Sequence, residues 1–286
     1  MGTEDTPTGQ DTPPSRVADT LLAGIDFTCS PSRRKPITVA TGRRAGGRLA
    51  VEAIASLDTL AAFERWLQTP GPWFGAFDFP FGLPRAFVES NALGTTCAEV
   101  IAAVHARCPT RMAWRACIDA WGNAQPPGQR LPHRASDRAS PVLPTSALQT
   151  RYVPVGLMYY EGIARLVASG ATIAGLHPGD PQRVAVEGYP RRLAHALIER
   201  RSYKNHDLPD RRAAREAIVG ALERDAAKRG FTLAIDAPLR ASLIDEPSGD
   251  RLDAVLCLVQ AARAAALPRH GLPETIDPVE GWIPDG

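Results

Sequence analysis

The sequence predicts an α/β fold, because three early apolar runs are followed by a helical stretch and then a fourth apolar run. The early runs cover residues 21–28, 35–41 and 48–54, and the fourth covers residues 73–77. Short runs bounded by turn-forming residues are typical of strands, whereas residues 56–68 place apolar side chains at helical spacing. With 44% hydrophobic residues in 286, the chain can bury a sizeable core.

The first elements predict an antiparallel meander that leads into a helix. An Ala-Gly-Gly turn at residues 45–47 separates the second and third runs, so we expect consecutive strands to pair antiparallel. Ser56 is placed to cap the helix that follows, which should end near Gln68. The apolar face of this helix is formed by Leu57, Leu60, Ala61, Phe63 and Leu67.

The next part of the chain, residues 85–157, interrupts the alternation of strands and helices. Residues 85–90 and 96–121 have helical patterns, and residues 125–149 are rich in Pro, Arg and Ser. Long loops in compact domains are often functional. We therefore interpret residues 85–157 as a helical and Pro-rich insertion that forms a lid or a substrate wall.

Alternation resumes after the insertion. Pro209 fits the first position of a helix that runs to about Lys228. The last helix should begin near residues 248–250 and end near Ala266, before Pro268. The remaining expected elements are a helix over 159–168, strands over 172–174 and 183–186, and a helix over 191–199.

One domain, residues 18–267, is expected to contain all these elements. Residues 1–17 are rich in Thr, Pro, Asp and Gly and predict a disordered tail. The Gly- and Pro-rich residues 268–286 predict an irregular C-terminal tail.

Composition narrows the functional classes only slightly. The net charge of +2 neither requires nor excludes nucleic acid as a partner. Five cysteines without a Cys-x-x-Cys pair argue against a disulfide framework or a zinc site, and we expect a cytoplasmic protein. No apolar run approaches the roughly 20 residues that span a bilayer, and no secretory signal is expected.

Acidic residues stand at the ends of predicted elements. Asp26 and Asp78 end apolar runs, Glu187 ends a third, and Asp250 and Asp253 are one turn apart on the last predicted helix. Ligand sites of open α/β sheets lie at the carboxyl ends of strands. Carboxylates close together need a cation or a proton, and Mg²⁺ and Mn²⁺ prefer oxygen ligands. These residues therefore predict a metal site.

Each acidic residue also has a purely structural interpretation. Asp26 could form a turn or a cap, and Asp78 before Phe-Pro could begin an Asx turn. Asp250 could cap its helix, with Asp253 favourably placed at the helix N-terminus. Glu187 could anchor a loop.

Further candidates are basic or isolated residues. Residues 191–229 contain 11 Lys and Arg against 6 Asp and Glu, a balance that suits a polyanion as well as a solvated surface. Within this stretch, Lys204 could contact a phosphate and His206 could carry a proton. Asp236 is a secondary candidate ligand, and otherwise a turn former. A second positive stretch is formed by Arg130, Arg134 and Arg138.

The Trp114 and Trp121 rings could stack bases, although a spacing of seven on a helix is more typical of a core. The sequence contains no His-Glu-x-x-His, phosphate-binding lysine loop, Gly-x-Gly-x-x-Gly or Gly-x-Ser-x-Gly motif.

Four motifs in order resemble a known family. They are Gly-Ile-Asp at 24–26, Phe-Asp-Phe-Pro at 77–80, Val-Glu-Gly-Tyr-Pro-Arg at 186–191 and Gly-Asp-Arg-Leu-Asp-Ala at 249–254. The chain resembles, over about 21–266, the domain of unknown function four-two-nine family, which is described as predicted ribonuclease H-like nucleases.

The resemblance implies a ribonuclease H-like, five-stranded mixed sheet flanked by helices. Asp26 would be the first-strand metal ligand and Asp78 the fourth-strand acid. Asp250 and Asp253 would match the terminal-helix acids of Holliday-junction resolvases. The family's own signature is matched by Glu187, Tyr189 and Arg191.

We therefore expect a Mg²⁺- or Mn²⁺-dependent phosphodiesterase acting on nucleic acid, DNA or RNA. Asp26, Asp78, Asp250 and Asp253 would hold two metal ions. Glu187 would complete the metal shell or position water. Phosphates would be bound by Lys204 and Arg191, beside Tyr189.

Two other classes stay open. Ribonuclease H-like sheets also occur in actin-like ATPases and sugar kinases, and residues 26–30 could imitate their ATP-binding loop. Those proteins contain two copies of the fold, however, and 286 residues leave little room for a second. The second alternative is a non-catalytic binding module in which the acids retain a structural metal or none.

Overall fold

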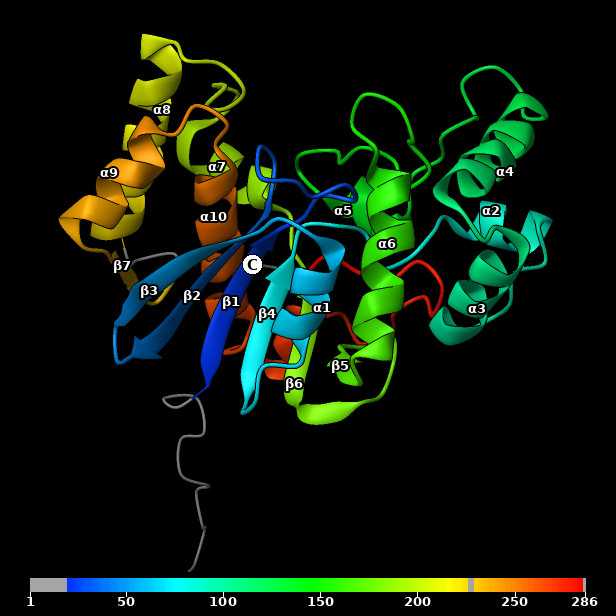
Figure 1. Cartoon of the computed structure of the whole chain (residues 1–286), viewed down its shortest axis with the longest axis horizontal. Helices are drawn as coiled ribbons and strands as arrows, with labels where there is room; N and C mark the ends of the chain where they lie inside the picture. Colours follow the sequence, from blue (N-terminus) through cyan, green and yellow to red (C-terminus); the bar gives the residue numbers. More distant parts are fainter. Residues whose placement is uncertain (1–19, 226–228, 285–286) are drawn as a thin grey trace, which may run out of the picture.

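A computed structural model describes residues 20–225 and 229–284 of the chain. The predicted disordered tail, residues 1–17, lies outside the described residues. So do residues 226–228, which include the expected end of the helix at Lys228. One mixed sheet stands at the centre of the structure, with helices on both of its faces (Figure 1).

The sheet has seven strands, in the order β5-β6-β4-β1-β2-β3-β7. Strands β1 to β3 form the expected antiparallel meander. Parallel pairs join β1 to β4, β4 to β6, β5 to β6 and β3 to β7. The strands are β1 (Leu21–Asp26), β2 (Ile37–Ala45), β3 (Arg48–Leu57), β4 (Trp73–Phe77), β5 (Ala171–Ile173), β6 (Asp180–Glu187) and β7 (Thr232–Ala234).

The mixed α/β architecture is confirmed, whereas the implied count of five strands is wrong. Strand β7 extends one edge of the sheet by pairing with β3, and β5 extends the other by pairing with β6. Each of these edge strands has only three residues. The strand expected over residues 172–174 corresponds to β5, whereas β7 was not among the expected elements. The sequence of β7 is too short to show the alternation that identifies a strand.

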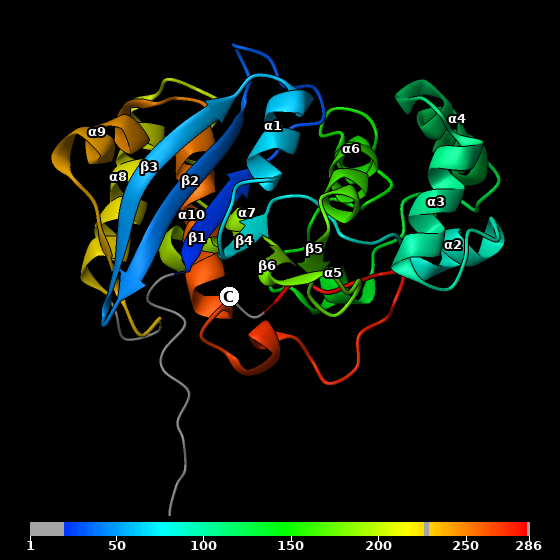
Figure 2. The same ribbon diagram turned by 60° about the horizontal axis from the view of Figure 1, so that its bottom comes forward.

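The helices divide between the two faces of the sheet (Figure 2). Helices α1 and α6 cover one face of the sheet, and α2 to α4 pack beside them. Helices α7 to α10 cover the other face. They are α1 (Leu60–Leu67), α2 (Arg85–Ser90), α3 (Cys97–Arg107), α4 (Arg111–Asn123), α5 (Ala135–Ala139), α6 (Val155–Ala168), α7 (Pro190–Ile198), α8 (Pro209–Arg224), α9 (Ala237–Asp245), α10 (Asp250–Ala264) and the 3₁₀ helix η1 (Pro268–Gly271).

Several predicted boundaries need correction. The first helix is capped by Thr59 rather than Ser56, because β3 continues to Leu57. The single helix expected over 96–121 is two helices, since Pro109 follows α3 and cannot continue it. Helices α5 and α9 had no counterpart among the expected elements.

Helix α10 lies directly on β1, and Gly24 permits this approach. A Cβ atom at Gly24 would collide with the backbone of α10 at Ala254 and Leu258. Main-chain atoms cannot move aside as a flexible side chain can. The glycine therefore sets the position of α10 over the strand that ends at Asp26.

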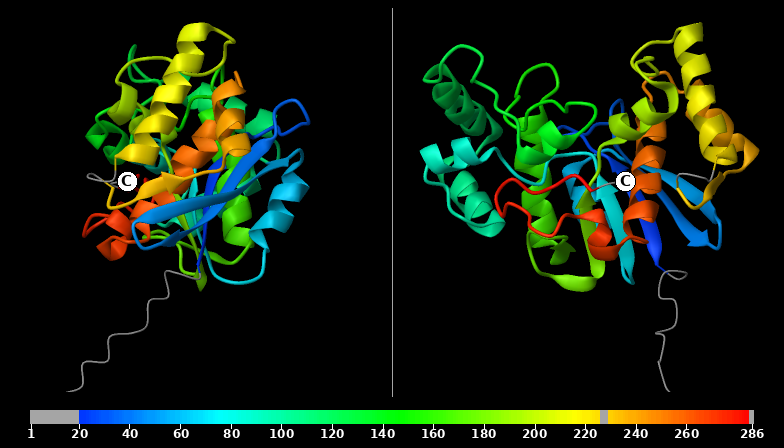
Figure 3. Two further views of the ribbon diagram at one scale, coloured as in Figure 1. Left: turned by 90° about the vertical axis from the view of Figure 1, so that its left-hand side faces the viewer. Right: turned by 180° about the vertical axis from the view of Figure 1, so that it is seen from behind.

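The residues after η1 form an ordered strap without helix or strand as far as residue 284. This strap runs past α2 and the insertion (Figure 3). The Leu83 N–H donates to the Val279 carbonyl at 2.9 Å. The Arg85 guanidinium donates to both carboxylate oxygens of Asp277, at 2.6 and 2.8 Å. The C-terminal segment thus connects the insertion to the main body.

All five cysteines are free thiols. Among residues 20–225 and 229–284, no helix combines the length and apolar character that a membrane crossing requires.

Candidate functional site

Two of the predicted acids lie at one edge of the sheet. Asp26 is the last residue of β1, and Asp78 directly follows β4, the parallel neighbour of β1. The Asp78 N–H donates to the Ile25 carbonyl at 2.9 Å, which extends the pairing to the ends of both strands. The adjacency expected from the sequence is therefore present.

Helix α10 adds a third carboxylate to this edge. Asp253 is fully buried, and Asp26 and Asp78 are partly buried. One carboxylate oxygen from each residue lies within 4.8 Å of the others. A donor set made only of carboxylate oxygens, with like charges facing one another, fits a hard divalent cation such as Mg²⁺ or Mn²⁺.

Tyr203 and Lys204 enclose this acidic group. The Tyr203 hydroxyl donates to Asp253 Oδ1 at 2.5 Å, and the Lys204 ammonium donates to Asp253 Oδ2. Sequence reasoning named Lys204 as a phosphate contact and did not single out Tyr203. A lysine beside three carboxylates supplies positive charge within the protein itself.

Burial and mutual repulsion raise the pKa values of the strand-end acids. The pKa of Asp26 lies well above its ordinary value, first through burial and then through the charge of Asp253. Burial also raises the pKa of Asp78, to about 7, although Lys204 opposes the change. Burial lowers the pKa of Lys204, but the charges of Asp253, Asp26 and Asp78 outweigh it and the net change is upward. These groups therefore titrate as one coupled cluster.

Asp250 lies beside the acidic group rather than within it. It is the first residue of α10, and Gly249, not Asp250, is the N-cap. Its charge contributes to the raised pKa of Asp26, and burial raises its own pKa. Asp250 is therefore an electrostatic neighbour of the group, one helical turn before Asp253.

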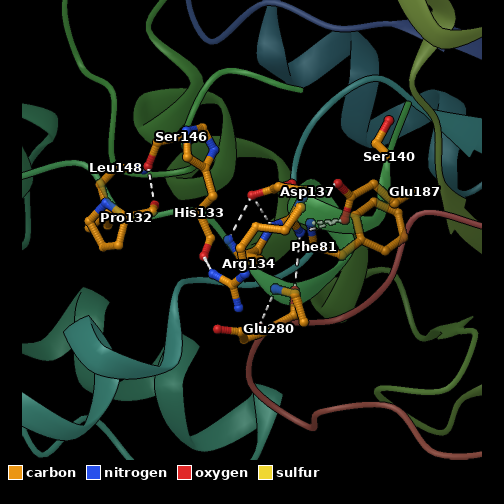
Figure 4. A network of polar contacts seen from close by, with 12 residues as sticks. Phe81, Pro132, His133, Arg134, Asp137, Ser140, Ser146, Leu148, Glu187 and Glu280 are labelled. Atoms are coloured by element: carbon orange, nitrogen blue, oxygen red, sulfur yellow. Dashed lines mark hydrogen bonds and ion pairs between the residues drawn. The ribbon is translucent and has the colours of Figure 1, made fainter. Parts of the chain in front are cut away.

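Glu187 points to a different partner. Its two carboxylate oxygens accept from the Arg134 guanidinium at 2.5 and 2.8 Å, and Oε2 also accepts from the Phe81 N–H at 2.9 Å (Figure 4). With both oxygens engaged, Glu187 anchors the insertion instead of completing the acidic group. Of its two interpretations from sequence, the loop anchor describes these contacts.

The Arg134 side chain is the centre of this buried network. It also binds Asp137 Oδ1 at 2.9 Å and the Glu280 carbonyl at 3.1 Å (Figure 4). The Glu280 carboxylate accepts from the backbone N–H groups of Ala135 and Arg85, at 2.7 and 2.8 Å. The positive stretch predicted from Arg130, Arg134 and Arg138 is therefore wrong for Arg134, because this residue is 2% exposed and its charge is paired.

Two arginines of α8 hold the segment that carries Tyr203 and Lys204. Arg215 donates to the Tyr203 carbonyl at 2.8 Å, and Arg211 donates to the Lys204 carbonyl at 2.7 Å. Their spacing of four places both on one face of the helix. This spacing was visible in the sequence, but it gave no indication of which carbonyl groups the arginines would meet.

A cleft of about 600 Å³ adjoins the acidic group, and Lys204 belongs to both. Its walls come from α7, from residues 199–205, from α8 and from the insertion. The lining residues are Pro141, Val142, Leu143, Arg191, Ala194, His195, Glu199, Arg200, Arg201, Ser202, Tyr203, Lys204, Asn205 and Arg211.

Tyr189 and Arg191 lie close to this region. The Tyr189 backbone exchanges two hydrogen bonds of 3.0 Å with the Gln260 side chain of α10. Burial raises the pKa of Tyr189 to about 12, with Arg191 opposing and Asp78 adding to the change. The signature residues thus place α7 beside both the acidic group and the cleft.

Other candidates have structural roles. Asp236 caps α9, where its Oδ1 accepts from the Leu239 N–H at 2.8 Å. Trp114 is fully buried, and both Trp114 and Trp121 pack edge-on against Phe87 in the core of the insertion. In the loop proposed to imitate an ATP site, Arg111 binds the Ser30 hydroxyl.

Comparison with known proteins yields one match. A family model described as "Protein of unknown function (DUF429)" matches residues 24–275. No curated protein and no solved structure matches the chain significantly. The matched region contains all three carboxylates of the acidic group together with Tyr203 and Lys204. With the model covering most of its length, the chain belongs to the DUF429 family.

Proposed function

We propose that the protein is a Mg²⁺- or Mn²⁺-dependent phosphodiesterase that acts on nucleic acid. The observation that carries this proposal is the convergence of Asp26, Asp78 and Asp253 within 4.8 Å, beside a cleft lined by basic residues. Carboxylates suit a divalent cation, and arginines suit phosphate oxygens. A metal-dependent phosphodiesterase would use both kinds of group next to each other.

A ribonuclease H-like fold is the finer assignment that we propose for the sheet. Three antiparallel strands, β1 to β3, precede β4 and β6, which add in parallel on the other side of β1. Acids at the ends of β1 and β4 and on α10 correspond to the positions implied by the resemblance. Strands β5 and β7 would then be additions at the two edges.

Within this proposal the residues have separate roles. Asp26, Asp78 and Asp253 would hold the metal, with Asp250 adding negative charge nearby. When bound, a divalent metal supplies charge stabilisation to a phosphoryl group and activates water. Tyr203 fixes the Asp253 carboxylate, while Lys204 and Arg191, which line the cleft, would bind phosphate oxygens.

A second candidate is a non-catalytic binding module, and the position of Lys204 favours it. The Lys204 ammonium already pairs with Asp253 and interacts with Asp26 and Asp78. A lysine in this position can balance the charge of the carboxylates without a metal. The two candidates make opposite predictions for metal binding.

Calorimetric titration with Mn²⁺ distinguishes them. We expect the wild type to bind Mn²⁺ and the Asp26→Asn and Asp253→Asn variants to lose at least tenfold in affinity, because each loses a charged ligand. Asp236→Asn is the matched control, since Asp236 caps α9. Loss of metal-dependent cleavage of labelled DNA and RNA in the same two variants would extend the result to activity.

Absence of Mn²⁺ binding by the wild type would contradict the metal-dependent mechanism in the free protein. The Lys204→Met variant then gives a further test. If Lys204 merely occupies the place of a cation, its removal should allow Mn²⁺ to bind. If neither protein binds Mn²⁺, the non-catalytic module is supported.

A further inference from the structure

We propose that the cleft beside the acidic group binds a single strand of nucleic acid, with phosphates on its arginine side and bases against its insertion side. This inference rests on the proposed function and names its substrate class. Three features of the cleft lead to it: the charge of one wall, the apolar character of the other, and the concave shape.

The arginine side carries charge that the protein leaves unneutralised. Arg191, Arg200 and Arg201 are exposed, and none forms an ion pair within residues 20–225 and 229–284. Glu199 is the only acidic residue among those that line the cleft. Exposed guanidinium groups in one wall are suited to a phosphate backbone, which they bind through paired N–H donors.

The part of the cleft lining that the insertion contributes is apolar. Pro141, Val142 and Leu143 form it, and the Leu143 side chain is 55% exposed although it is a large hydrophobic residue. Unstacked bases pack their uncharged faces against aromatic side chains and also against apolar ones. A duplex keeps these faces stacked inside, so it would leave the apolar wall without a partner.

The concave shape also favours one strand. Proteins read duplex DNA with a helix or ribbon that projects into a groove. Here the charged and apolar groups line the same hollow of about 600 Å³, the size of a site for a small ligand or a short stretch of strand. Lys204 connects this hollow to the carboxylates, so a strand in the cleft would present a phosphate to them.

Fluorescence anisotropy in EDTA tests this inference without any cleavage. The probes are a fluorescein-labelled 12-nucleotide single strand and the duplex formed with its complement. We expect the single strand to bind at least tenfold more tightly than the duplex. Arg200→Ala/Arg201→Ala should weaken single-strand binding about tenfold and flatten its salt dependence, because phosphate contacts release counterions.

Two further variants complete the design. Arg48→Ala/Arg65→Ala is the matched control, since both arginines are exposed on β3 and α1, away from the cleft. It should leave binding unchanged. Leu143→Ser should weaken single-strand binding several-fold while keeping the salt dependence, as expected for loss of an apolar contact.

The outcomes separate this inference from the proposed function. Equal or tighter binding of the duplex would overturn the single-strand inference, and so would unchanged binding by Arg200→Ala/Arg201→Ala. The assay contains no divalent metal, so its result does not depend on the Mn²⁺ titration. Single-strand binding that the wild type shows and the cleft variants lose would support the inference even if the Mn²⁺ titration failed.

Discussion

The Asp78 carboxyl should make the stability of the metal-free protein depend on pH. Its pKa is raised by burial to about 7 in the folded chain, whereas an unfolded aspartate titrates near pH 4. Between these values the folded chain holds a proton that the unfolded chain has lost. Stability from this group is therefore complete below about pH 4 and is lost as pH rises through about 7.

The Asp78→Asn variant should consequently gain stability relative to wild type as pH rises from about 4 to 8. Urea unfolding in EDTA at several pH values measures this difference. The raised pKa of Asp26 adds a slope of the same sign, which is smaller in the variant because the charge of Asp78 contributes to that raised pKa. A difference that stays constant over this range would show that Asp78 ionises normally.

At the residue scale, sequence reasoning succeeded where a position depends on chain direction alone. Asp26 and Asp78 follow the apolar runs of neighbouring strands, so their proximity could be predicted. Glu187 ends a strand in the same way, yet its partner Arg134 lies 53 positions earlier in a Pro-rich loop. Nothing in the local pattern indicates that such an arginine is buried.

At the element scale, the buried Arg134 should be essential for attaching α5 to the end of β6. Arg134→Ala leaves Glu187 and Asp137 buried without their cation. Loss of one partner from a buried pair costs about 3–5 kcal/mol. We expect a decrease of this size in the free energy of unfolding, measured by urea denaturation.

Arg138→Ala is the control for this experiment, because Arg138 is exposed on the same short helix. It should change stability by no more than about 0.5 kcal/mol. Equal effects of the two substitutions would mean that the buried network contributes nothing beyond an ordinary surface arginine.

Helices and strands could be predicted where they were long or where turn and capping residues clearly marked their ends. The meander was indicated by apolar runs and a glycine turn, and α8 and α10 by their start signals. Strand β7 and helix α5 have three and five residues, so periodicity could not identify them. Their positions depend on tertiary contacts: β7 pairs with β3, and Glu280 binds the first N–H of α5.

At the scale of the whole molecule, the insertion should unfold together with the sheet. One hydrophobic cluster includes Phe77 of β4, Phe63 of α1 and Trp114 of α4. A continuous core favours a single cooperative transition. Hydrogen exchange at increasing urea should therefore show α4 and β4 losing protection in the same step.

Earlier loss of protection in α4 would instead mark the insertion as a separate folding unit. The opposite face of the central sheet provides an internal reference for this hydrogen-exchange measurement. Helix α10 packs in a second cluster on the opposite face, so its exchange reports on that face independently.

The origin of the acidic group in distant parts of the chain has a consequence for biosynthesis. A ribosome that has completed β6 has already made Asp26 and Asp78, but neither Lys204 nor Asp253 exists yet. At that stage two carboxylates face each other with no lysine to balance them and no α10 to cover β1. Any activity that requires all three carboxylates must therefore await α10, so the nascent chain remains inert until the described fold is almost completely synthesised.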